Sequence, residues 1–169
     1  MKVVGIALAI ALALALQTTL ARFVLRGTVA VDLVLVVVVY VALTSGPVTG
    51  LLTGSVAGLV QDALSSGIIG IGGLAKTVVG FLAGVIGTQF IVAQPLPRFV
   101  VFVAATALHA LIFMGLYALL DVRHFGAPYA AVGGQALGNA IVGVLAFQLV
   151  ELLPGAVERR RMQRTRLRR

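Results

Sequence analysis

The stretch Gly46–Gly84, GPVTGLLTGSVAGLVQDALSSGIIGIGGLAKTVVGFLAG, decides how this chain folds. Glycine recurs at every fourth position in its first half and again near its end, so on a helix each row forms a smooth ridge that another helix can approach closely. A glycine-rich bend separates the two rows. We therefore predict a pair of closely packed helices, with helix-packing positions at Gly46, Gly50, Gly54, Gly58, Gly80 and Gly84.

The composition around this stretch is that of a membrane protein. Of the 169 residues, 60% are hydrophobic and 11% are charged, and the mean hydropathy is +1.13. These values lie far from those of soluble domains. The chain has no cysteine, which excludes disulfides and thiolate metal sites.

Long apolar runs without alternation favour transmembrane helices over a barrel. We predict an all-α polytopic membrane protein with six transmembrane helices in a domain spanning residues 1–155, followed by a basic tail at 156–169. The first segment resembles a secretory signal, but it leads into more apolar segments, so we expect it to be retained. Pro154 and Gly155 are expected to end the last helix. The expected spans are 3–20, 29–43, 47–64, 74–92, 99–120 and 130–153.

The charge distribution predicts the orientation. The net charge is +8, and seven arginines fall within the last eleven residues. Beside a membrane helix, such a tail indicates the cytoplasmic side and contact with anionic lipid, rather than nucleic acid. Both termini are therefore predicted to be cytoplasmic, against a weaker opposing signal from Arg22 and Arg26. The predicted membrane-surface residues are Arg159, Arg160, Arg161 and Arg164.

Asp62 and Lys76 flank the bend, and charged groups at membrane depth need a partner or water. The preferred interpretation is a structural ion pair that closes the bend. The alternative is a site at which the two charges bind a ligand, a proton or a partner's polar group. A small channel or proton-coupled carrier around Asp62 would need a polar lining that the sequence does not supply.

Three further polar residues lie within apolar segments: His109, Gln135 and Asn139. We interpret them as interhelical hydrogen-bonding groups. The alternatives are a proton relay at His109 and a small polar pocket walled by Gln135 and Asn139. No catalytic triad or paired carboxylates can be assembled, so we expect neither an enzyme nor a metal or cofactor site.

The central stretch resembles the rod shape-determining protein MreD family. The resemblance rests on Asp32, on GLLTGSVAGLVQD at 50–62 and on GIGGLAKTVVG at 70–80. A proline that often precedes the family's early aspartate is replaced here by Val31. The length, the six expected spans and the basic tail also agree with that family.

The resemblance implies a non-catalytic subunit of the bacterial inner membrane. It would act with MreC, and indirectly with RodA, a penicillin-binding protein and MreB, to scaffold or regulate lateral peptidoglycan synthesis and maintain rod shape. The ridge at Gly50, Gly54 and Gly58 would then pack internally or face MreC. The alternative is a substrate-binding subunit of an energy-coupling-factor vitamin transporter, whose fold MreD proteins are thought to share.

Overall fold

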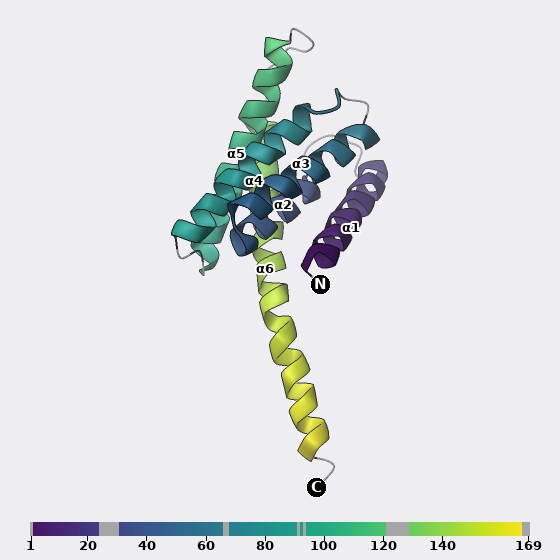
Figure 1. The fold of residues 1–169 in the computed structure, drawn as a ribbon, viewed down its shortest axis with the longest axis vertical. Helices are drawn as coiled ribbons and strands as arrows, with labels where there is room; N and C mark the ends of the chain where they lie inside the picture. Colours follow the sequence, from purple (N-terminus) through teal and green to yellow (C-terminus); the bar gives the residue numbers. More distant parts are fainter. Residues whose placement is uncertain are drawn as a thin grey trace.

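The computed structural model describes residues 2–23, 31–65, 68–90, 92, 94–120 and 129–166, and they form six α-helices without a strand. Figure 1 shows the long helices α5 and α6 side by side, crossed obliquely by α3 and α4, with α1 at the edge of the bundle. The helices are α1 (Lys2–Phe23), α2 (Leu33–Ser45), α3 (Pro47–Leu64), α4 (Ile71–Gln89), α5 (Pro95–Leu119) and α6 (Tyr129–Arg166).

The short helix α2 is the centre of the bundle. It has only 13 residues, yet it contacts all five other helices. Its valine-rich sequence is buried on nearly every side, and Val34, Val38, Val39 and Ala42 are fully enclosed. A helix that is apolar all round is expected in such a position. The β propensity of the valines has no effect here, because inside a membrane a helix satisfies every backbone group.

Three of the described helices are long and apolar enough to cross a membrane: α4, α5 and the Tyr129–Leu152 part of α6. Apolar segments within α1 and α2 are shorter, at Val3–Thr19 and Leu33–Ser45. The prediction of six helices is therefore confirmed, whereas six full spans are not. Glycine, threonine, glutamine and aspartate make α3 less apolar than its neighbours, and α2 is only about 20 Å long.

The expected end of the last helix was wrong. α6 continues through Pro154 and Gly155 to Arg166, so the tail begins as part of a 38-residue helix. The residues after Gly155 are mostly glutamate, arginine, methionine and glutamine, which favour helix strongly enough to continue it beyond the proline. By contrast, Pro95 and Pro97 are the first and third residues of α5, where a missing N–H is harmless.

Candidate functional site: a polar cluster at the centre of the bundle

Five polar residues from four helices meet inside the bundle, and we call them the central polar cluster: Asp32, Lys76, Thr106, His109 and Asn139. All five are at least nine-tenths buried. They come from the N-terminal end of α2, from α4, from α5 and from α6.

Lys76 is the cation of this cluster. Its Nζ lies 3.1 Å from Asp32 Oδ2 and 3.1 Å from His109 Nε2. Because an ammonium group can only donate hydrogen bonds, His109 accepts through Nε2 and carries its proton on Nδ1. Protonating His109 at Nε2 would place a second cation beside Lys76. The arrangement therefore stabilises a charged lysine, a charged aspartate and a neutral histidine.

Asp32 also fixes the start of α2. Its Oδ1 accepts a hydrogen bond from Leu35 N at 3.0 Å, as an N-cap does. Its own N–H donates to Asn139 Oδ1 at 2.8 Å, and Asn139 Nδ2 donates to Thr106 Oγ1 at 3.0 Å. One continuous network thus joins α2, α4, α5 and α6.

The central polar cluster lies near mid-membrane depth. Thr106 and His109 are close to the middle of α5, and Asn139 is close to the middle of the Tyr129–Leu152 span. Because these residues lie halfway along two helices that can span the membrane, the cluster lies near the centre of an apolar layer about 30 Å thick. Charges at that depth are costly unless they are paired or hydrated, and Lys76 and Asp32 pair with each other here.

The predicted ion pair between Asp62 and Lys76 was wrong. Lys76 pairs with Asp32, whereas Asp62 Oδ2 accepts hydrogen bonds from the backbone N–H groups of Gly70 at 2.9 Å and Gly73 at 3.0 Å. Asp62 therefore satisfies donors at the N-terminal end of α4, where the helix dipole also favours a negative charge. A Cβ atom at Gly72 would collide with Asp62 Oδ1, so a larger residue there would require this carboxylate to shift.

The glycine rows of α3 and α4 face one another. A Cβ atom at Gly50 would collide with the carbonyl oxygen of Gly80, and one at Gly54 would collide with that of Lys76. At Gly58 it would lie 2.5 Å from Gly73 Cα, and at Gly84 it would strike Pro47. The glycine ridge of α3 is thus covered by α4. Of the two expectations, internal packing and a surface facing MreC, the structure favours internal packing. Gly46 starts α3 with φ +89°, a conformation that favours glycine.

The other predicted residues are less central. Gln135 lies one helical turn before Asn139 on α6 and is partly exposed. Arg159, Arg160, Arg161 and Arg164 lie on the C-terminal part of α6, and their side chains fall outside the described residues.

Sequence reasoning missed the second ion pair. Arg98 Nη2 bonds Glu151 Oε1 at 2.5 Å, Arg98 Nε donates to Val92 O at 3.1 Å, and the guanidinium lies 4.3 Å from the centre of the Phe147 ring. The signal was available, because α5 and α6 are antiparallel neighbours and these charges lie at matching ends of their spans.

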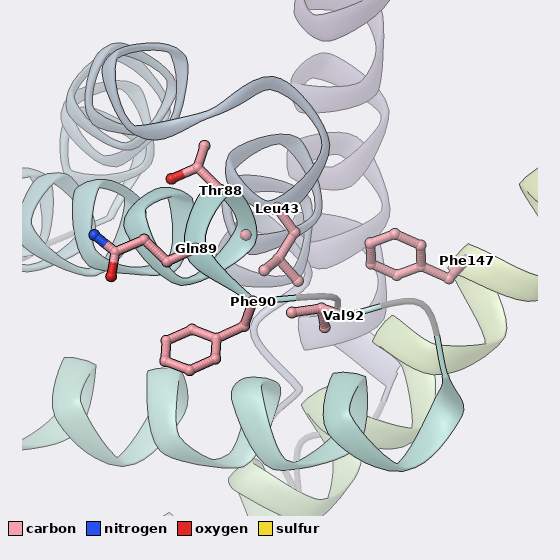
Figure 2. Close-up of a pocket in the computed structure, with 7 residues that line it drawn as sticks. Leu43, Thr88, Gln89, Phe90, Val92 and Phe147 are labelled. Atoms are coloured by element: carbon pink, nitrogen blue, oxygen red, sulfur yellow. The ribbon is translucent and has the colours of Figure 1, made fainter.

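A pocket of about 390 Å³ lies near this ion pair (Figure 2). Apolar side chains from the C-terminal end of α2, from the residues after α4 and from α6 form most of its wall, and two exposed polar residues from the end of α4 complete it. Its lining residues are Leu43, Gly87, Thr88, Gln89, Phe90, Val92 and Phe147.

A helical bundle with apolar spans and a paired charge cluster at mid-depth defines a polytopic membrane protein. The family model for the rod shape-determining protein MreD matches residues 1–154. The chain therefore belongs to the MreD family, which confirms the resemblance, and its role lies in rod shape determination. The chain matches no curated protein and no solved structure.

Proposed function

We propose that this chain is a non-catalytic inner-membrane subunit of the cell-elongation complex, acting with MreC to scaffold or regulate lateral peptidoglycan synthesis. The membership in the MreD family supports a role in cell shape. The observation that carries the proposal further is the central polar cluster, whose charges bond to one another and tie four helices together. Such a network holds a scaffold in one arrangement.

In this proposal MreC supplies a single membrane helix that packs against an outer face of the bundle. The glycine ridge of α3 is occupied by α4, so the partner helix would use another surface. Exposed apolar side chains for such contact occur on α1 (Leu8), on α3 (Leu52, Val56) and on α5 (Leu111). RodA, a penicillin-binding protein and MreB would be reached through MreC. Both termini would be cytoplasmic, with the arginines near anionic lipid.

Photo-crosslinking tests the proposed partnership. A photoreactive residue would be placed in turn at Leu8, Leu52, Val56 and Leu111, with the fully buried Val38 as the control position. We expect MreC to crosslink from one of the exposed faces and not from Val38. If no exposed face crosslinks to MreC while the protein still restores rod shape to cells depleted of their own MreD, the direct partnership is wrong.

The same depletion strain tests the function itself. Expression of this chain should restore rod shape to the round depleted cells. Calorimetry with a panel of vitamins provides the opposing measurement. Saturable binding without shape rescue would instead favour the substrate-binding subunit of an energy-coupling-factor transporter.

A further inference from the structure

The bend between α3 and α4 includes the described residues Ser65 and Ile68–Gly70. Gly70, the N-cap of α4, lies six residues before Lys76, which is about 9 Å along a helix. Since Lys76 bonds to His109 near mid-membrane depth, the bend lies short of the edge of the apolar layer, which is about 15 Å from its centre. The oblique path of α4 in Figure 1 reduces this height further.

A second contact, made by α5, gives a similar depth relative to His109. Ile68 N donates to the hydroxyl of Tyr117 at 3.2 Å. Tyr117 lies eight residues after His109 on α5, or about 12 Å along that helix. Figure 1 also shows the C-terminal end of α5 extending beyond the turn that joins α3 to α4.

The opposite end of α4 lies farther from Lys76 than the bend does. From Lys76 to Gln89 the helix runs 13 residues, or about 20 Å, which exceeds half of the apolar layer. The last residues there, Thr88 and Gln89, are polar and exposed. Along its own axis, α4 therefore extends farther beyond Lys76 at this end than it does toward the bend.

Backbone N–H groups at the bend are hydrogen-bonded inside the protein. Irregular backbone requires such internal hydrogen bonds wherever water is absent. Two side chains supply acceptors: Asp62 for Gly70 N and Gly73 N, and Tyr117 for Ile68 N. Around the bend, backbone carbonyl groups also accept hydrogen bonds from the N–H groups of Ser65, Ile71 and Leu74.

The outward surface of the bend is apolar apart from the exposed Ser65, whose hydroxyl donates to Asp62 O at 3.1 Å. Ile69 is 66% exposed and Ile68 is 40% exposed, and Leu64 and Leu74 on either side are exposed as well. A cluster of exposed large apolar residues indicates contact with protein or lipid rather than with water. Gly70 adopts φ +106°, which allows the chain to reverse tightly.

From these observations we infer that the bend is immersed in the apolar layer and contacts lipid tails, with Asp62 and Tyr117 supplying the hydrogen bonds that water would otherwise supply. The hairpin of α3 and α4 is then re-entrant at this end. Soluble parts of a partner reach the bundle here through the ends of α5 and α6 and not through the bend.

Cysteine labelling tests the inference directly, because the chain contains no cysteine. The variants are Ile69→Cys in the bend, Leu120→Cys at the end of α5 and Leu111→Cys near the middle of α5. All three positions are exposed on the protein surface, so only the surrounding solvent differs. A membrane-impermeant maleimide is applied to right-side-out and inside-out vesicles, and total thiol is measured after dissolution in SDS.

We expect Leu120→Cys to be labelled in one vesicle type, whereas Ile69→Cys and Leu111→Cys are labelled in neither until SDS is added. Labelling of Ile69→Cys at the rate of Leu120→Cys would overturn the inference. A nitroxide attached at position 69 gives a second measurement, which does not depend on thiol reactivity. At position 69, as at position 111, oxygen should accelerate the relaxation of the nitroxide more than a water-soluble nickel chelate does. The reverse order at position 69 would also overturn the inference.

Discussion

At the residue scale, Lys76 is the side chain that links two members of the central polar cluster, Asp32 and His109. Its ammonium group neutralises Asp32 and bonds His109 in a region that water does not reach. Removing one partner of such a pair leaves a buried charge uncompensated, and the penalty for that charge is larger than the net stability of the pair itself.

We therefore predict that Lys76→Met destabilises the protein by about 3–5 kcal/mol, because it leaves the Asp32 carboxylate buried without its cation. Unfolding by SDS in mixed micelles measures this change. The double variant Asp32→Asn with Lys76→Met should recover part of the loss, since no charge then remains unpaired. Equal stability of Lys76→Met and the wild type would contradict the role assigned to the pair.

The second ion pair provides a matched control. Glu151 is mostly exposed, with a side chain at 56%, although Arg98 is buried. Glu151→Gln is expected to lose less stability than Lys76→Met, because water solvates the carboxylate and Arg98 keeps its contacts with Val92 O and the Phe147 ring. The same SDS titration measures both variants. If Glu151→Gln loses as much stability as Lys76→Met, depth in the membrane does not decide how strongly an ion pair stabilises the protein.

Asp62 should behave as a helix-capping residue. Asp62→Ala removes the acceptor of Gly70 N and Gly73 N and is expected to destabilise the protein by about 1–3 kcal/mol. Asp62→Asn retains an acceptor oxygen and should lose less. If the two variants lose the same stability, the charge rather than the hydrogen-bond acceptor is what matters at this position.

At the scale of elements, α3 and α4 are held by backbone contact along their glycine rows. Packing of this kind relies on dispersion between closely approaching helices, because lipid gives no hydrophobic advantage to burial. The sequence spacing was sufficient to predict the pair. It could not show which surface the ridge faces, because that depends on where Gly73, Lys76 and Gly80 fall on the opposing helix.

Gly54→Ala should therefore separate α3 from α4 and destabilise the protein by about 1–3 kcal/mol, since its Cβ would meet the carbonyl group of Lys76. Leu52→Ala, on the exposed face of the same helix, is the matched control and is expected to have little effect. SDS titration of both variants checks this. An undiminished midpoint for Gly54→Ala would mean that the two helices separate without penalty.

At the scale of the whole molecule, the class of the protein and its family could be read from the sequence, but the central polar cluster could not. Asp62 and Lys76 are near each other along the chain, which suggested a pair, yet Asp62 is taken by the backbone of the bend. The actual partner, Asp32, is 44 residues from Lys76, and Asn139 bonds Asp32 across 107 residues. Such contacts depend on how all the helices assemble.

The continuity of α6 has a mechanical consequence. One continuous helix joins Asn139 in the central polar cluster to Arg166, so the backbone of the C-terminal arm shares its helical register with the bundle. Each residue inserted between Leu152 and the first arginine of the arm would rotate all the arginines by about 100° around its axis. The angular position of these arginines around the axis of α6 is therefore set by the number of residues that separate them from Leu152.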